Sequence, residues 1–148
     1  MICSFFGHRN ASNEIEKELK PAIVDLIENH NVYSFYVGNQ GNFDSLVHRA
    51  LKELSLQYPI SYHVVLAYMP EKLNEFDSLD YSDTIVFDGI ESVPKRFAID
   101  HRNRWMIKQS DYVITYVAYD VGSGASKYKQ YAERLGRKVI NLRIQTDS

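Results

Sequence analysis

Three short segments of the chain combine glycine with polar or charged side chains, and each follows an apolar run. They are Gly7-His8-Arg9, Gly38-Asn39-Gln40-Gly41-Asn42-Phe43-Asp44 and Gly122-Ser123-Gly124-Ala125-Ser126-Lys127. Glycine lets the backbone turn sharply and approach a ligand closely. A helix that begins there offers unpaired N–H groups and the positive end of its dipole, which suit phosphate. The pattern predicts an anion-binding rim, and tight strand-to-helix turns are the alternative interpretation.

Five ionisable side chains in or near this rim could make specific contacts. Arg9 suits bidentate binding of phosphate or carboxylate, or else a salt bridge to Asp44. His8 suits a structural hydrogen bond or a ligand contact, and Asp44 suits the dipole of the following helix or a ribose hydroxyl. Arg102 belongs to a solvated helix face, a dimer contact or a phosphate clamp. Lys127 is a point charge for phosphate or an exposed lysine in a first helical turn.

Several familiar catalytic and cofactor motifs are missing from the sequence. Lys127 follows Ser126 rather than preceding it, so the Walker A pattern fails, and no Gly-x-Gly-x-x-Gly fingerprint follows the first apolar run. The five histidines are scattered without zinc spacing, and no Gly-x-Ser-x-Gly elbow occurs. We therefore predict no metal and no cofactor, and the sequence identifies no catalytic residue. The single cysteine, Cys3, lies in an apolar run and is interpreted as a core residue.

Strand-like and helix-like runs alternate along the whole chain. The predicted strands are 2–6, 32–37, 62–68, 84–87, 112–117 and 139–142, with an irregular stretch at 69–80. The predicted helices have a firm part at 20–30, with Pro21 as a kink or a start, then 43–54, 95–109 and a helix beginning near Gly124 and ended by Gly136. Continuous apolar strands that alternate with helices are typical of a parallel sheet covered on both faces.

The fold class predicted from this alternation is α/β, with a Rossmann-like, doubly wound, mainly parallel sheet and helices on both faces. Ligands bind such folds at the carboxyl ends of the strands. Phosphate is expected at the start of the last helix, and a base near Asn39, Gln40 and Phe43. The predicted ligand-binding residues are Gly7, His8, Arg9, Gly38, Asn39, Gln40, Gly41, Phe43, Asp44, Arg102, Gly122, Ser123, Gly124, Ala125 and Lys127.

Composition sets the remaining expectations. The 148 residues predict one domain over 1–148, and the net charge of −2 predicts against bulk attraction to nucleic acid or anionic membrane. Neither a signal peptide nor an apolar run of about 20 residues occurs, so we expect a cytoplasmic protein without membrane contact. The second half is rich in tyrosine and holds Trp105, which favours a homodimer or higher homo-oligomer.

The chain resembles the YpsA-like proteins of the SLOG superfamily, which also includes DprA/Smf and Lonely Guy proteins. Phe5-Phe6-Gly7-His8-Arg9 and Gly38 to Asp44 resemble the F-x-G-H-R and G-x-x-G-x-F-D signatures of the YpsA-like proteins. Segments 102–106, 110–114 and 138–142 resemble the region before their last glycine loop and their final strand. The resemblance implies a Rossmann-like fold that binds nucleotides or molecules derived from them, often as a dimer.

Two functions follow as expectations. Lonely Guy enzymes carry a glutamate in the loop that corresponds to 122–129, where this chain has none. The first expectation is therefore a sensor or sequestering protein for an ADP-ribose-like or cyclic nucleotide. The alternative is an enzyme that cleaves or transfers at an N-glycosidic bond, with a carboxylate from Asp44, Glu71, Asp88 or Glu91. Single-stranded DNA binding of the DprA kind is disfavoured by the net charge of −2.

Overall fold

Six parallel strands form one sheet in the computed structural model, which describes residues 1–69, 83–118 and 124–144. The strands are β1 Ile2–Gly7, β2 Ser34–Val37, β3 Ser61–Leu66, β4 Thr84–Val86, β5 Tyr112–Tyr116 and β6 Lys138–Asn141. Their order is β4-β3-β2-β1-β5-β6, and every neighbouring pair is parallel. The chain first builds outward from β1 to β4 and then returns to the other side of β1. The point where the order reverses therefore lies between β1 and β5.

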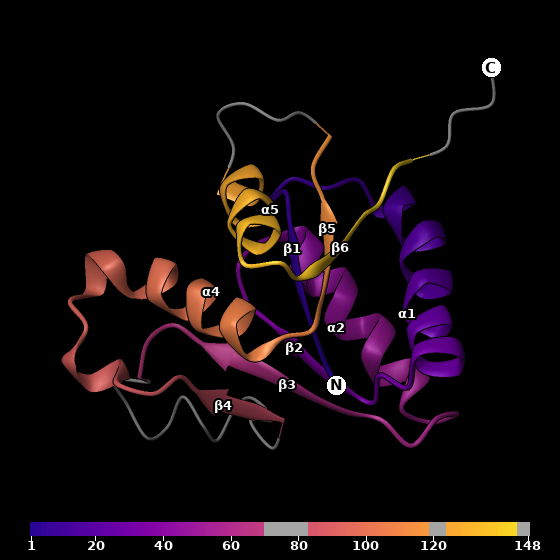
Figure 1. The fold of residues 1–148 in the computed structure, drawn as a ribbon, viewed down its shortest axis with the longest axis horizontal. Coiled ribbons are helices and arrows are strands. Elements are labelled where there is room, and N and C mark those ends of the chain that lie inside the picture. The colour runs from indigo at the N-terminus through magenta and orange to yellow at the C-terminus, as the bar shows by residue number, and fades with distance from the viewer. Residues whose placement is uncertain (70–82, 119–123, 145–148) are drawn as a thin grey trace.

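Helices cover both faces of this sheet (Figure 1). The helices α1 Glu16–His30 and α2 Asn42–Leu54 connect β1 to β2 and β2 to β3, and they pack against each other. The helices α4 Ala98–Gln109 and α5 Gly124–Arg134 lie beside each other on the opposite face. The 3₁₀ turns are 13–15, 90–92 and 95–97. The predicted fold class, a doubly wound α/β sheet with helices on both faces, is confirmed.

Alternating side chains of the strands supply two separate cores. Phe5 joins the larger core with α1 and α2, whereas Phe6 joins the smaller core with α4 and α5. Successive side chains of a strand point to opposite faces of its sheet, so one strand serves both layers. Cys3 is fully buried in the larger core, and this burial raises the pKa of its thiol. The thiol therefore stays protonated, which agrees with a structural role.

The first helix begins earlier than predicted. Helix α1 starts at Glu16, not near residue 20, and Pro21 lies inside it on the exposed face. The buried stripe of Leu19, Ile23 and Leu26 runs past the proline, so packing outweighs the backbone hydrogen bond that proline cannot make. Gly136 follows α5 with φ +74° and supports the predicted helix end. Most of the stretch predicted as irregular, residues 70–80, lies outside the described residues.

No helix in the described ranges is long and apolar enough to cross a membrane.

Candidate functional site

A pocket of about 380 Å³ opens at the carboxyl end of the sheet, beside the point where the strand order reverses. The ends of β1 and β2 and the starts of α2, α4 and α5 all contribute to its wall. Its lining residues are Phe5, Phe6, Gly7, His8, Arg9, Asn10, Gly38, Gln40, Asp44, Ile99, Arg102, Asn103, Gly124, Ala125 and Tyr128. This is the edge at which open α/β sheets bind their ligands.

Arg102 is the most deeply buried cation of the pocket. Its side chain comes from the second turn of α4, and the residue is only 2% exposed. The guanidinium donates to Asn103 Oδ1 and Asn39 Oδ1, each at 3.0 Å, and to the carbonyl of Val65 at 3.4 Å. Within the described ranges it forms no salt bridge with a carboxylate. Burial lowers the pKa of Arg102, the charge of Asp44 opposes this shift, and the charge of Arg9 adds to it. Its hydrogen-bond partners are thus neutral, and the charge of Asp44 acts on it without a salt bridge among the described residues.

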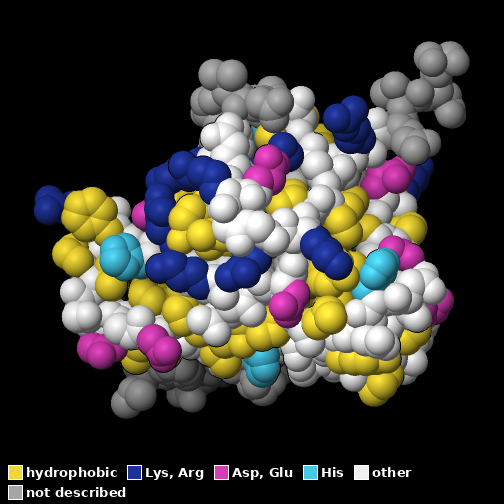
Figure 2. All heavy atoms as spheres, in the orientation of Figure 1, with side chains coloured by type: hydrophobic (Ala, Val, Ile, Leu, Met, Phe, Trp, Pro, Cys, Tyr) yellow, Lys and Arg dark blue, Asp and Glu magenta, His cyan; other side chains and the backbone are white. Residues whose placement is uncertain are grey.

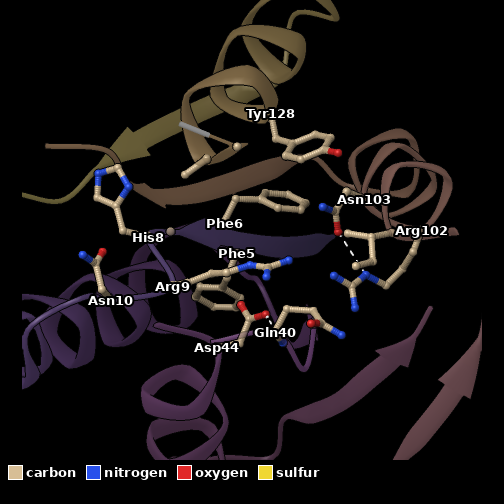
Figure 3. A pocket seen from close by; sticks show the side chains of 15 residues that line it. Phe5, Phe6, His8, Arg9, Asn10, Gln40, Asp44, Arg102, Asn103 and Tyr128 are labelled. Carbon is tan, nitrogen blue, oxygen red and sulfur yellow. Dashed lines mark hydrogen bonds between the residues drawn. The ribbon is translucent and has the colours of Figure 1, made fainter. Parts of the chain in front are cut away.

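Arg9 brings a second guanidinium to the same pocket. Figure 3 shows Arg9 and Arg102 entering from opposite sides, with Asp44 and Gln40 along one wall. The loop that carries Arg9 is held against the start of α2, because the N–H of Asn42 donates to the Arg9 carbonyl at 2.8 Å. The Asn42 side chain also donates to the carbonyl of Ala11 at 2.6 Å. The backbone at Arg9 is therefore fixed although its side chain is exposed.

Asp44 is the carboxylate of the pocket. It lies in the first turn of α2, is 8% exposed and accepts a hydrogen bond from the N–H of Gln40 at 2.9 Å. Burial raises the pKa of Asp44 to about 6, against the opposing effects of Gln40, Arg102 and Arg9. No salt bridge joins Arg9 and Asp44 among the described residues. Near neutral pH the pocket thus holds two cations and one carboxylate that protonates easily.

His8 links the ends of two neighbouring strands. Its Nε2 accepts from the N–H of Ala118 at 2.9 Å, and its ring meets Tyr116 edge-on. Burial lowers the pKa of His8, which keeps the imidazole neutral and able to accept at Nε2. This geometry favours the structural interpretation of His8.

The glycines of the first two segments make room for side chains. A Cβ at Gly7 would lie 2.3 Å from the ring of Phe43, which is fully buried beneath it. A Cβ at Gly38 would lie 2.9 Å from both Arg102 Nη2 and Asp44 Oδ2. Gly124 differs, because a Cβ there would meet nothing within 4 Å. The first two glycines therefore let the pocket residues pack, whereas the start of α5 is open.

Asp100 connects the two helices beside the pocket. Its carboxylate accepts from Tyr128 at 2.8 Å and from Arg104 at 3.0 Å, and it pairs with Lys127 at 3.0 Å. Burial and this contact raise the pKa of Tyr128 to about 12, so its hydroxyl remains a donor. Asp100 thereby fixes the start of α5 against α4.

Most of the predicted binding residues meet in this pocket. Those that line it are Gly7, His8, Arg9, Gly38, Gln40, Asp44, Arg102, Gly124 and Ala125. Those placed elsewhere are Asn39, which holds Arg102, Gly41 beside the Arg9 backbone, the buried Phe43, and Lys127, which is paired with Asp100. The buried ring of Phe43 leaves no face for a base. Gly122 and Ser123 lie outside the described residues.

Three polar lining residues were not predicted from the sequence: Asn10, Asn103 and Tyr128. Asn103 holds Arg102, and Tyr128 lies one turn after Gly124 on the same side of α5. Helical spacing from Gly124 could have found Tyr128, whereas Asn10 and Asn103 directly follow the predicted Arg9 and Arg102. The described residues include no group of three or more His, Cys, Asp or Glu side chains placed to hold a metal ion.

Charge is divided unevenly along the chain. Residues 1–94 hold 6 Lys or Arg and 14 Asp or Glu, whereas residues 95–148 hold 11 and 5. The two parts therefore carry formal charges of −8 and +6. Figure 2 shows Lys and Arg side chains gathered over α4 and α5. The total of −2 hides a strongly basic region.

Comparisons with known proteins support the fold of the chain and nothing finer. No protein-family model matches the chain, and no curated protein matches it. A solved structure of DNA processing protein A (DprA) from Helicobacter pylori, described for its single-stranded DNA binding mode, matches with a TM-score of 0.66 and 16% identity. The match covers 100% of this chain and 67% of that chain. It supports the same Rossmann-like fold.

This likeness corrects two expectations from the sequence. The expectation of a nucleotide sensor, with a nucleotide-cleaving enzyme as the alternative, is overturned, and so is the expectation that disfavoured nucleic acid as a partner. A protein described as binding single-stranded DNA has this fold. The physical source of the error is the use of total charge, because DNA meets a local surface and not the average of the molecule.

Proposed function

We propose that this chain binds single-stranded DNA, with a backbone phosphate in the pocket between Arg9, Arg102 and the start of α5. The observation that carries the proposal is the buried guanidinium of Arg102, which has neutral hydrogen-bond partners and no carboxylate paired with it among the described residues. A buried cation without a salt bridge is costly, and the nearby Asp44 does not remove that cost, since the pKa of Arg102 stays lowered. An anion entering the pocket would offset it. The DprA structure supplies the class of anion.

The pocket chemistry suits phosphate. Arginine offers a planar fork of donors that matches phosphate oxygens, and Arg9 faces Arg102 across the same space. The first residues of α5, Gly124 and Ala125, form part of the wall, and a helix start adds N–H donors and a favourable dipole. A helix start alone would be weak support, but here it joins two guanidinium groups.

A single strand fits this recess better than a duplex. The pocket is recessed among loops, and its volume of about 380 Å³ is near the lower end for small-ligand sites. A flexible single strand can bend one phosphate into such a space, whereas a duplex presents its phosphates on a stiff outer surface.

We also infer that residues 1–148 form one SLOG-like domain of the YpsA kind. Support comes from the two signature segments, Gly7-His8-Arg9 and Gly38 to Asp44, which contribute six lining residues to the same pocket. The ring of Phe43 in the second signature packs beneath Gly7 in the first, so the two segments depend on each other for their packing.

Fluorescence anisotropy with a labelled oligothymidylate of about 12 nucleotides tests the function. Arg102→Gln removes the charge and keeps a side chain that can hydrogen-bond to Asn103, and we expect it to weaken binding at least tenfold, about 1.4 kcal/mol. Arg9→Gln, at an exposed position, should weaken it similarly without any folding cost. The matched control is Arg49→Gln, because Arg49 pairs with Glu16 outside the pocket. The proposal fails if the wild-type chain shows no saturable binding at about 100 µM, or if both pocket variants bind like the control.

A further inference from the structure

Four cations line the exposed edges of α4 and α5, and we call them the α4–α5 basic face: Arg104, Lys108, Lys127 and Arg134. The Lys127 side chain is 52% exposed and that of Arg104 is 37% exposed. Lys108 and Arg134 are exposed and form no salt bridge with any described residue. The pocket already described does not include any of the four.

Acidic side chains on these helices are too few to neutralise the face. Asp100 serves both Arg104 and Lys127, at 3.0 Å each, so one carboxylate lies between two cations. Glu133 pairs with Lys129 at 2.9 Å. The opposite helical layer differs, because there Lys20 pairs with Glu53 and Arg49 pairs with Glu16. Most of the excess positive charge after residue 94 therefore belongs to α4 and α5.

An aromatic ring lies within the same face. The guanidinium of Arg104 lies over the ring of Tyr131 at 4.6 Å from its centroid, and that of Arg134 lies at 5.9 Å. Arginine planes and tyrosine rings both stack on nucleic-acid bases without sequence preference. Single-stranded nucleic acid is bound by cations, which contact its phosphates, and by aromatic rings, on which its bases stack. The α4–α5 basic face offers both.

A structural role explains one neighbouring cation but not the face itself. Arg137 donates to the carbonyls of Ile107 at 3.3 Å and Lys108 at 3.2 Å, so it satisfies the end of α4. We therefore leave Arg137 out of the face. The side chains of Lys108 and Arg134 have no comparable bond to a carbonyl among the described residues.

The face is continuous with the pocket through both helices. Arg102 and Asn103 of α4 line the pocket, and Arg104 follows them directly. Tyr128 of α5 lines it as well, and Tyr131 and Arg134 follow on the next turns of the helix. A strand with one phosphate in the pocket therefore meets the face as it leaves.

We propose that the α4–α5 basic face is a second, sequence-independent contact surface for the same DNA strand, which leaves the pocket along α4 and α5. This inference rests on the proposed single-stranded DNA binding in the pocket. It adds that affinity grows with oligonucleotide length, because a short oligonucleotide fills the pocket only and a longer one also reaches Arg134 and Lys108.

The test compares two oligothymidylates, of about 4 and about 16 nucleotides, on a charge-reversed face. The variant is Lys108→Glu with Arg134→Glu. The matched control is Lys17→Glu with Lys52→Glu, which reverses the same charge at two exposed lysines of α1 and α2. We expect the face variant to bind the long oligonucleotide at least tenfold more weakly than the control does, and the short one equally well. Replacing the same two residues by glutamine should give a smaller loss in the same direction.

Salt dependence provides a second measurement. Each phosphate contact on a single strand contributes about 0.7 to the slope of log affinity against log salt. Removing two contacts should make the slope for the long oligonucleotide shallower by about 1.4, and the control should keep the wild-type slope. Thermal unfolding followed by circular dichroism verifies that both double variants are folded.

The outcomes separate this inference from the proposed function. If the wild-type chain binds neither oligonucleotide, the proposed function fails and this inference fails with it. If the wild type binds the short oligonucleotide and the face variant binds the long one as the control does, only the second surface is overturned. That result would also be expected if the face served an acidic protein partner. If the face variant and the control lose the same affinity for the long oligonucleotide, the loss comes from the total charge of the protein. That result would overturn the inference too.

Discussion

The two helical layers of this molecule cover the same sheet, but their buried residues differ in polarity. Against α1 and α2 the buried side chains are almost all apolar, with Leu19, Ile23 and Leu51 fully buried. Against α4 and α5 the core is smaller, and Arg102, Asn103 and other polar residues are buried within the layer. The surface charges follow the same division, since the acidic part of the chain precedes residue 95 and the basic part follows it.

This difference separates stability from binding. Apolar burial is the main favourable contribution to folding, and the α1–α2 layer supplies most of it. Burying the Arg102 charge without a salt bridge opposes folding, so the α4–α5 layer gives up stability to hold a charge at the pocket. Both layers meet at the carboxyl ends of β1 and β2, where Asp44 of α2 and Arg102 of α4 share one wall.

The largest effect that we predict is on stability in the α1–α2 layer. Leu19→Ala leaves a cavity at a fully buried position and should lower the free energy of unfolding by about 3 kcal/mol. The remaining folded protein should bind the oligonucleotide with unchanged affinity. Urea unfolding and anisotropy at low temperature measure the two quantities, with Lys17→Ala as the exposed control on the same helix. If the folded Leu19→Ala protein binds the oligonucleotide much more weakly, the α1–α2 layer affects binding as well as stability.

The next effect concerns the two kinds of glycine at the pocket. Gly38→Ala would place a Cβ 2.9 Å from Arg102 Nη2 and Asp44 Oδ2, so the guanidinium must move. We expect roughly tenfold weaker oligonucleotide binding, about 1.4 kcal/mol. Gly124→Ala, whose Cβ meets no protein atom within 4 Å, should keep the packing of the pocket and should weaken binding less than Gly38→Ala does. If Gly124→Ala is the more damaging of the two, the start of α5 and not Arg102 dominates phosphate binding.

Local pattern was enough to predict the strands, the fold class and the edge that holds the pocket. Apolar runs such as 112–116 and the glycine segments after three of the strands are visible in the chain itself, and the parallel arrangement follows from the alternation of strands with helices. The boundary of α1 was missed because Pro21 suggests a break, whereas the buried stripe that overrides it depends on tertiary packing.

Side-chain placement within the rim could not be read from the chain. Phe43 follows a glycine segment and suggests a base contact, yet it is buried beneath Gly7, which lies far away in sequence. Arg102 gave no sign of burial, because its neighbours in α4 are polar and its hydrogen-bond partner Asn39 belongs to another segment. Contacts between distant segments decide such details, and periodicity reports only on neighbours.

The smallest predicted effect is a pH dependence located at Asp44. Its pKa is raised to about 6, mainly by burial, so the folded state favours the protonated form. As the pH falls through 6, Asp44 becomes neutral and the pocket loses the carboxylate that opposes Arg9 and Arg102. Oligonucleotide affinity should then rise by about threefold between pH 7.5 and pH 5.5, or ~0.7 kcal/mol, the Coulomb energy of two unit charges about 6 Å apart in water.

The sign for stability follows from the same shift and gives an independent measurement. A raised pKa means that Asp44 favours the folded state below its unfolded value of 3.8, and that this contribution is lost as the pH rises through about 6. Asp44→Asn keeps the shape of the side chain without the charge. It should bind at pH 7.5 about as tightly as the wild type does at pH 5.5, and any pH dependence left in it arises outside Asp44. Anisotropy titrations of both proteins at the two pH values decide the matter: parallel pH profiles would show that the pocket carboxylate does not oppose the bound strand.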